Sequence, residues 1–341
     1  MKTTPIAEAA VSSVKSRYWR DAGRTLEWEP LGGDTKEAFD RKCNNISDDA
    51  PLPYREQLED YKINPVTYKL NNEGFRGDNF NTKDEFTVFL GCSHTTGCGH
   101  YFENTWPYHM MEHLKWDSKM ANMSNGGVGI ASGFRLLYKY KNILKIKRIF
   151  CFFPHWARYE FKEDKGEWII VQPQILGEML SHFGEEVQQN SIAMRTFGTW
   201  LINFETIWWE YCSHVRAIYS IAQELNVPLY FTPQIDRKYR SKPPNTNVFY
   251  ARDQHSSTYI YYGIFKQFKD LIDNNDYITA EKLDKLLLTR SPMGDEPLLD
   301  VNADGNLVWY GDDTINPPEA LNKQQILDIE KKQFNKKKRL L

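Results

Sequence analysis

The sequence predicts an α/β fold built on a mostly parallel sheet, and two of its features support this prediction. Short runs that are apolar throughout alternate with longer segments whose apolar residues recur every three or four positions. The short runs also end in glycine or polar residues, such as "GCS", "SNGG" and "ARDQH". Strands that are apolar on both faces are typical of a parallel sheet covered by helices on each side. In such a sheet, binding and catalytic residues gather at the carboxyl ends of the strands.

The predicted elements alternate along the middle of the chain. The run "EFTVFLGC" reaches glycine and is the first clear strand, and "IKRIFCFFP" is equally apolar. Pro107 stands near the first turn of the next helix, where proline is tolerated. We expect strands at 85–92, 120–125, 146–154, 226–234 and 247–253. We expect helices at 105–116, 131–145, 192–224 and 256–272.

Polar extensions flank this α/β segment, which we place at residues 85–275. Residues 1–84 are broken by glycine and proline, so we expect an irregular N-terminal extension with short helices. Residues 276–341 form a polar C-terminal extension. Within it, the stretch 300–313 begins like a calcium loop, but its twelfth position is Gly311 instead of glutamate. We interpret this stretch as an Asp-Gly turn.

Length, charge and hydropathy place the chain among ordinary globular proteins. Of its 341 residues, 26% are charged and 41% are apolar, and the formal net charge is −2. A charge so near zero gives no argument for nucleic acid as a partner. No stretch approaches the roughly 18 apolar residues of a membrane span, and residues 1–21 lack the apolar core of a signal peptide. The five cysteines are an odd, scattered set that favours a reducing compartment, so we expect a cytoplasmic protein without a membrane partner.

The stretch "FLGCSHTTGCGH" at 89–100 allows a metal-binding interpretation. Its cysteines and histidines have the spacing C-x-H-x3-C-x-H, and both residue types bind zinc. Structural zinc sites usually draw their ligands from two separated pairs, and ligands this close together would strain the loop. An apolar strand also leads directly into Cys92. We therefore expect no metal and no cofactor, with the cysteines as small buried residues and the histidines as loop residues.

The same stretch allows a nucleophile at Ser93. A strand ends, Gly91 permits a tight turn, and Ser93 stands where the next element begins, so nearby N–H groups can face an oxyanion. A serine needs a base, and the end of the last predicted strand offers Asp253 and His255. An aspartate beside a histidine can orient the imidazole and stabilise its protonated form. A thiolate on Cys92 is the alternative nucleophile.

Several blocks of the sequence resemble the SGNH hydrolases, also called GDSL-type esterases and lipases. "GCSHTTGCG" resembles their first block, usually Gly-Asp-Ser-x-Thr-x-Gly, and "NNEGFRGDNF" and "GCGHYFENTWPYHM" resemble the segments on either side of it. "NMSNGGVGIASG" resembles the second block and "ARDQHSS" the last. The resemblance covers roughly residues 70–270. It implies a flavodoxin-like three-layer α/β/α sandwich and hydrolysis of acyl esters.

The resemblance also implies a role for each site residue. Ser93 is the nucleophile, and Asp253 and His255 complete the catalytic triad. The oxyanion hole is formed by the N–H groups of Ser93 and Gly127. The family's third block adds an asparagine, but "PHWARYEF" has none at that place, and His155 is the candidate replacement donor.

Two further departures from the family leave two functions open. Cys92 replaces the family's aspartate, and Asp253-Gln254-His255 is one residue shorter than the usual Asp-x-x-His. The first function is a serine esterase acting on small acyl esters, with acetyl groups on a carbohydrate as one substrate class. The second is a catalytically impaired domain that serves as a structural or binding module in a homo-oligomer or larger assembly. The joint presence of Ser93, Gly127, Asp253 and His255 favours the enzyme.

Overall fold

The chain forms two compact units, residues 1–291 and 292–341. The computed structural model describes residues 16, 18–28, 34–45, 52–153, 158–162, 168–171, 204–233, 239, 258–288, 299–301 and 307–309. In the second unit, β9 (Leu299–Val301) pairs antiparallel with β10 (Leu307–Trp309). The predicted Asp-Gly turn falls on residues 302–306, which lie outside the described part of the chain.

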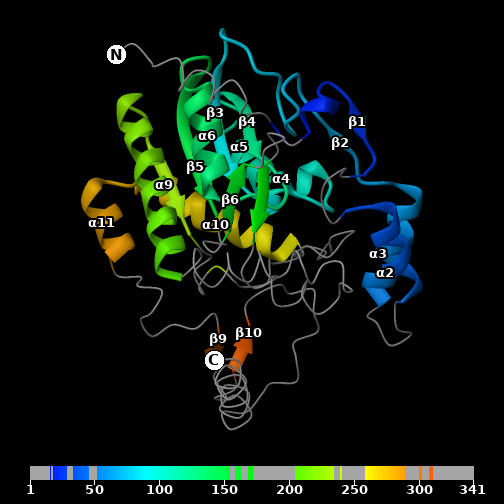
Figure 1. The fold of residues 1–341 in the computed structure, drawn as a ribbon. Helices are drawn as coiled ribbons and strands as arrows, with labels where there is room; N and C mark the ends of the chain where they lie inside the picture. The colour runs from blue at the N-terminus through cyan, green and yellow to red at the C-terminus, as the bar shows by residue number, and fades with distance from the viewer. Residues whose placement is uncertain are drawn as a thin grey trace. The chain divides into compact units, whose positions relative to one another are not determined.

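A parallel sheet of four strands organises the first unit (Figure 1). Its strands are β3 (Glu85–Gly91), β4 (Lys119–Ser124), β5 (Lys145–Phe152) and β8 (Leu229–Thr232). They lie in the order β4-β3-β5-β8, and all neighbours are parallel. Counted along the chain, this order matches the beginning of the flavodoxin-like arrangement. The predicted α/β class is confirmed, whereas the predicted strand at 247–253 lies outside the described residues.

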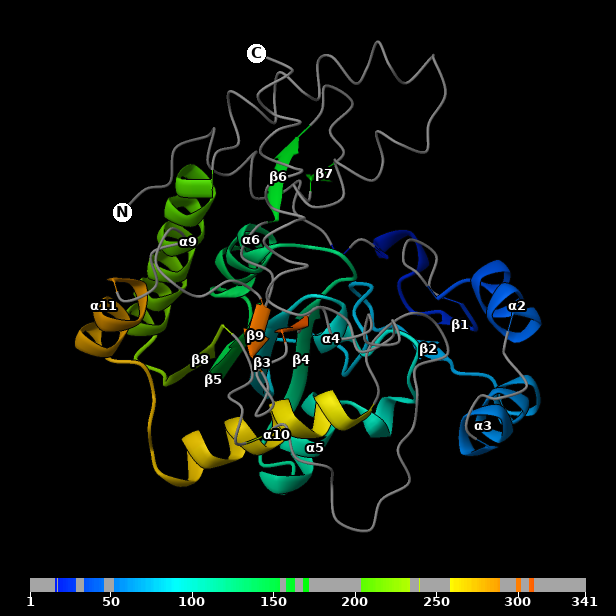
Figure 2. The ribbon, with the colours of Figure 1, turned by 90° about the horizontal axis from the view of Figure 1, so that it is seen from below.

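Two helices cover each face of the sheet. These helices are α5 (Trp106–His113), α6 (Ile130–Tyr140), α9 (Phe204–Glu224) and α10 (Thr258–Asp273). Figure 2 shows α6 and α9 on one side of the strands and α5 and α10 on the other. Buried side chains of each helix pair pack against opposite faces of the same strands, which gives three layers. No helix among the described residues is long and apolar enough to cross a membrane.

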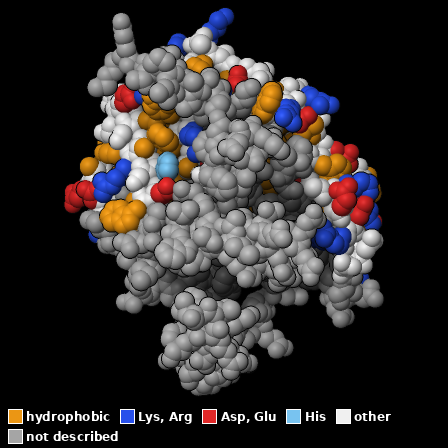
Figure 3. Space-filling view, viewed as in Figure 1, with side chains coloured by type: hydrophobic (Ala, Val, Ile, Leu, Met, Phe, Trp, Pro, Cys, Tyr) orange, Lys and Arg blue, Asp and Glu red, His pale blue; other side chains and the backbone are white. Residues whose placement is uncertain are grey.

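Short elements precede the sheet. They are the single-turn helix η1 (Trp19–Asp21), β1 (Thr25–Leu26), α2 (Lys36–Asn44), α3 (Leu52–Ile63) and β2 (Tyr68–Lys69). β1 and β2 pair antiparallel, and Thr35 caps α2 by accepting from Ala38 N at 3.1 Å. Side chains of both charges mix over α2 and α3 on the face in Figure 3. A small cluster that includes Tyr18, Phe39 and Tyr68 forms the local core.

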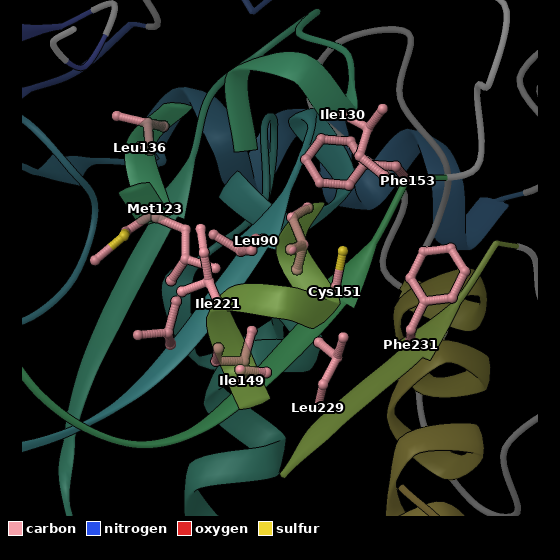
Figure 4. Packing of buried hydrophobic residues seen from close by; sticks show 14 of the residues in the cluster. Leu90, Met123, Ile130, Leu136, Ile149, Cys151, Phe153, Ile221, Leu229 and Phe231 are labelled. Carbon is pink, nitrogen blue, oxygen red and sulfur yellow. The ribbon is translucent and has the colours of Figure 1, made fainter. Parts of the chain in front are cut away.

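The alternation of side chains along the strands builds two different cores. On the α6 and α9 face, mostly aliphatic side chains of strands and helices, with some aromatic rings and cysteines among them, point toward one another. Figure 4 labels Leu90, Met123, Ile130, Leu136, Ile149, Cys151, Phe153, Ile221, Leu229 and Phe231. The α5 and α10 face is aromatic. There the rings of Phe89 and Phe150 stack at 5.3 Å, and those of Trp106 and Phe268 stack at 4.9 Å. Burying each such side chain stabilises the fold by about 1.5–3 kcal/mol.

One predicted boundary in this region was wrong, and one pair of strands was not predicted. The helix predicted at 131–145 ends at Tyr140, because Ile143 N and Leu144 N both donate to Tyr140 O and turn the chain into β5. The sequence did not predict the strands after β5, where β6 (Tyr159–Lys162) pairs antiparallel with β7 (Trp168–Val171). The alternation of side chains in "YEFK" is the sequence signal that this hairpin follows.

Candidate active site

Ser93 stands at the junction of an inner strand and a short helix. β3 ends at Gly91, Cys92 is the N-cap with an extended backbone, and α4 covers Ser93–Thr96. The backbone N–H groups of Thr95 and Thr96 donate to Cys92 O at 2.9 and 3.0 Å and close the turn. The structure therefore places Ser93 at the carboxyl end of β3, where its own N–H begins a helix.

Two glycines allow α4 to pack on the end of the strand. A Cβ at Gly91 would lie 1.8 Å from Thr95 Oγ1 and 2.9 Å from Phe152 O, so the contact itself requires glycine. Gly97 ends α4 in the left-handed region with φ 75°, which favours glycine. Its N–H donates to Ser93 O at 2.8 Å. A larger residue at either position would displace the helix that carries Ser93.

The buried guanidinium of Arg76 holds the loop that follows α4. It donates to four backbone carbonyls, those of Thr67 (3.0 Å), Thr96 (3.2 Å), Gly97 (2.7 Å) and His100 (2.8 Å). Its carbon Cζ lies 4.7 Å from the centre of the Tyr68 ring. Burial lowers the pKa of Arg76, and the carbonyl oxygens replace the water that the charge has lost. Arg76 therefore fixes the stretch of chain that follows Ser93, from Thr96 to His100.

Polar side chains of β4 fix α4 from another direction. Asn122 Nδ2 donates to Thr95 O at 3.0 Å, and the hydroxyls of Ser124 and Thr96 lie 3.0 Å apart. Ser124 Oγ also donates to Asn122 Oδ1. The sequence interpretation missed these residues. Their signal is a pair of polar residues, two positions apart, in an otherwise apolar strand.

A glycine-rich loop, residues 125–129, joins β4 to α6 and is called the glycine loop below. It lies beside the turn that carries Ser93, because Gly91 and Ser124 are partners in the parallel register of β3 and β4. Gly127 has φ 76°, a conformation that glycine adopts without strain. Its N–H donates to no acceptor within the described part of the chain. This loop therefore presents a backbone donor at the strand end next to Ser93.

The N-terminal segment contacts the same loop. Gly126 N donates to Tyr18 Oη at 3.2 Å. Ser16 Oγ donates to Gly74 O at 2.6 Å and lies 3.0 Å from Asn125 Oδ1. Because all of these groups are buried, the segment holds one side of the glycine loop in place.

The predicted base lies outside the described residues, as do its aspartate and the third oxyanion donor: His255, Asp253 and His155. Ser93 is buried, and its hydroxyl makes no hydrogen bond to another described residue. The helix that follows the Asp-x-His segment, α10, does lie beside α4. The ring of Tyr261 in its first turn packs 6.2 Å from the ring of His94 and 4.6 Å from that of His100.

The cysteines and histidines of 89–100 serve the packing of this region. Cys92 and Cys98 are buried. The ring of His94 also packs against Phe152, at 6.4 Å. Among the residues that the structure describes, no three His, Cys, Asp or Glu side chains are grouped as metal ligands.

Comparison with known proteins finds a distant likeness in structure. No family profile matches the chain. No curated protein matches it significantly. Among solved structures, the chain is similar to a member of the lipolytic protein G-D-S-L family from Veillonella parvula, with TM-score 0.26 and 10% identity over 55% of this chain and 98% of that one. Because this likeness is too distant to carry an argument about activity, the α/β assignment rests on the parallel sheet and its two helical layers.

Proposed function

We propose that the chain is a serine esterase of SGNH type that hydrolyses small acyl esters through an acyl-enzyme on Ser93. The proposal rests mainly on one observation: the carboxyl ends of the neighbouring strands β3 and β4 lie side by side. Ser93 follows β3 as the first residue of a helix. Gly127 lies in the loop after β4, and its N–H has no acceptor among the described residues. A nucleophile beside backbone donors is the arrangement that acyl transfer requires.

The proposed reaction follows from these groups. His255 removes the proton of Ser93 Oγ, which attacks the ester carbonyl and forms a tetrahedral intermediate. The N–H groups of Ser93 and Gly127 stabilise its oxyanion, with His155 as the third donor, and Asp253 orients His255. The protonated His255 then gives its proton to the leaving alcohol. Water, activated by His255, hydrolyses the acyl-enzyme and restores Ser93.

The position of α10 supports the choice of His255 as the base. His255 precedes the first residue of α10, Thr258, by three positions. Because consecutive Cα atoms are about 3.8 Å apart, the two Cα atoms are separated by no more than about 11 Å. The first turn of α10 packs beside α4 through Tyr261, and this proximity supports the proposal that His255 serves as the base for Ser93.

The position of Cys92 favours Ser93 over the thiol as the nucleophile. Cys92 is the N-cap of α4, which is the position of the aspartate in the usual Gly-Asp-Ser block. Its side chain makes no capping hydrogen bond and is buried. Cys92 therefore supports the turn, whereas Ser93 is the first residue of the helix and the better candidate nucleophile.

The test is hydrolysis of p-nitrophenyl acetate by wild type and Ser93→Ala. We expect the substitution to lower kcat on the order of 10³-fold or more. Ser118→Ala is the matched control, because Ser118 immediately precedes β4 at the opposite end of the sheet, and it should keep the wild-type rate. A fluorophosphonate probe should label wild type at Ser93 and leave Ser93→Ala unlabelled.

Equal rates for wild type and Ser93→Ala would sink the serine mechanism. Absence of both hydrolysis and labelling in folded wild type would favour the binding-module alternative. If the enzyme is confirmed, a panel of acetylated carbohydrates compared with free acetyl esters identifies the substrate class.

A further inference from the structure

Arg158 and Glu160 together bind both polar atoms of one peptide unit of the glycine loop. Arg158 Nη1, at the start of the hairpin, donates to Val128 O at 3.1 Å. Glu160 Oε1, two residues later, accepts from Gly129 N at 2.5 Å. Val128 C=O and Gly129 N–H belong to the same planar peptide, so the two bonds together fix its orientation.

Glu160 is built into this position. Its side chain is fully buried, and Oε2 accepts from Ser132 Oγ at 2.7 Å and from Arg135 Nη2. The N-cap of α6 is Gly129, which has no side chain to satisfy the free N–H groups of the helix. Glu160 supplies that cap from a distant segment, where the helix dipole and the Arg135 cation both favour its negative charge.

The fit between hairpin and loop depends on glycine. A Cβ on Gly129 would lie 2.9 Å from Arg158 O and 3.1 Å from Glu160 Oε1. The backbone of Gly129 is in an ordinary extended conformation, so the absence of a side chain serves the contact and not the backbone angle. The hairpin therefore sits directly on the start of α6.

The loop is pinned on the other side as well. Tyr18 Oη accepts from Gly126 N at 3.2 Å, which fixes the peptide between residues 125 and 126. The Gly127 N–H belongs to the next peptide and has no acceptor among the described residues. The one peptide that presents the proposed oxyanion donor thus lies between two anchored parts of the loop.

We propose that Arg158 and Glu160 are positioning residues for the Gly127 N–H. The inference rests on the proposed function and adds the means by which the donor is held before substrate arrives. A preorganised donor stabilises the developing oxyanion without reorganising at the moment of reaction. The hairpin stands where the family's third block would supply an asparagine, and here it contributes rigidity to the second block.

The kinetic test measures kcat and KM for p-nitrophenyl acetate in Glu160→Ala and Arg158→Met. Because an oxyanion donor acts in the transition state, we expect kcat to fall about 10- to 100-fold while KM changes less than about threefold. Arg158→Lys keeps a donor for Val128 O and should retain most of the rate that Arg158→Met loses.

Asp117→Asn is the matched control for Glu160→Ala. Asp117 is also a carboxylate that accepts from cationic side chains, Arg148 and Lys147, but it lies at the amino end of β4. Its loss should lower stability and leave kcat within about twofold of wild type. Glu160→Gln, which keeps one acceptor oxygen, replaces Glu160→Ala if circular dichroism shows that the alanine variant does not fold. A kcat loss in the position-160 variant no larger than that in Asp117→Asn, or a change confined to KM, overturns the proposal.

Amide hydrogen exchange gives a second readout that needs no activity. Peptides covering residues 125–130 should exchange faster in Glu160→Ala and Arg158→Met than in wild type or Asp117→Asn. Unchanged exchange in both variants overturns the positioning role whatever the activity. If Ser93→Ala hydrolyses ester as fast as wild type, the proposed function fails, and the exchange rates still decide whether the hairpin holds the loop.

Discussion

At the scale of single residues, Arg76 is a buried charge whose described partners are carbonyl oxygens. It forms no ion pair with a carboxylate in the described ranges. Its guanidinium instead donates to carbonyls before α4, at its last residue and after it. A planar guanidinium can satisfy several carbonyls at once, whereas an ammonium is a compact point charge. The shape of the side chain therefore matters as much as its charge.

We predict that Arg76→Lys lowers the free energy of unfolding by about 2 kcal/mol, because lysine cannot reach all four carbonyls and leaves buried acceptors unsatisfied. Urea denaturation of both proteins measures the difference. Arg24→Lys is the control, since Arg24 pairs with Asp21 at the surface and its change should cost little. Equal, small losses for the two variants would show that the carbonyl cage does not stabilise the fold.

Burial separates the reactivities of the cysteines. Cys43 is partly exposed, whereas the other four thiols are buried: Cys92, Cys98, Cys151 and Cys212. Burial raises the pKa of Cys43 and Cys151 and raises the pKa of Cys212 to about 11. Since the thiolate is the reactive form and needs access, Cys43 should react first with a thiol reagent.

We predict that one thiol of the native protein reacts fast with a thiol reagent, and that this fast reaction disappears in Cys43→Ser. Titration with Ellman's reagent, native and then in denaturant, measures this, and all five thiols should react after unfolding. A fast thiol that persists in Cys43→Ser and maps to Cys92 would contradict the prediction. That result would also reopen the thiol as the nucleophile.

At the scale of elements, the periodicity of apolar residues predicted the main strands and helices. It did not predict the side-chain contacts between segments that are distant in the chain. The apolar runs of β3 and β5 and the spacing of α9 are local patterns, and local patterns identify local structure. Glu160 is a charged residue in a short stretch, and its partners lie on α6, far away in the chain. No local rule distinguishes such a buried carboxylate from an exposed one, so its role became visible only in the folded chain.

Asp117 joins the amino ends of two strands and is sensitive to pH. Arg148 of β5 donates to both its oxygens, at 3.2 and 2.7 Å, and Lys147 Nζ lies 3.0 Å from Oδ2. Desolvation raises the pKa of Asp117, but the hydrogen bonds from Arg148 and Lys147 outweigh it and the pKa lies below its ordinary value. A lowered folded pKa stabilises the protein above the unfolded pKa, about 3.9, and this contribution is lost as pH falls through the folded value.

Asp117→Asn should therefore be less stable than wild type at pH 7, and the difference should shrink below about pH 4. Urea denaturation at a series of pH values from neutral to acid measures both proteins. Because the pair is partly exposed, added salt should also reduce the difference. A difference that is constant with pH would assign the effect to packing instead of charge.

At the scale of the whole molecule, the fold brings residues from three distant stretches to one glycine loop. The loop itself follows β4, Ser93 follows the neighbouring strand, Tyr18 comes from the N-terminal segment and Glu160 from the hairpin. Parallel strand order made the first two neighbours predictable, because adjacent strands end at the same edge. The contacts of Tyr18 and Glu160 depend on how the N-terminal segment and the hairpin after β5 fold against the loop, which no pattern in the sequence specifies.

The first compact unit extends past the α/β segment that the sequence outlines. Ile278 N donates to Leu229 O at 2.8 Å, so the chain after α10 lies against β8. Leu283 of α11 (Ala280–Leu288) is buried in the core that α6 and α9 share, and Arg216 pairs with Asp284 at 2.8 Å. Residues 276–288 are therefore part of the packing of the sheet.

We predict that a chain ending at Ser291 folds and keeps the Ser93-dependent hydrolysis proposed for wild type, whereas a chain ending at Asn275 is destabilised by at least about 2 kcal/mol. The longer chain retains the whole first compact unit, and the shorter one removes Leu283 from the aliphatic core and the hydrogen bond to β8. Urea denaturation and p-nitrophenyl acetate hydrolysis of both chains, beside wild type, measure the outcome.

Failure of the chain ending at Ser291 to fold would mean that the second unit contributes to the stability of the first. Equal stability of the two shortened chains would mean that α11 contributes nothing measurable, and that the sheet with its four covering helices is sufficient.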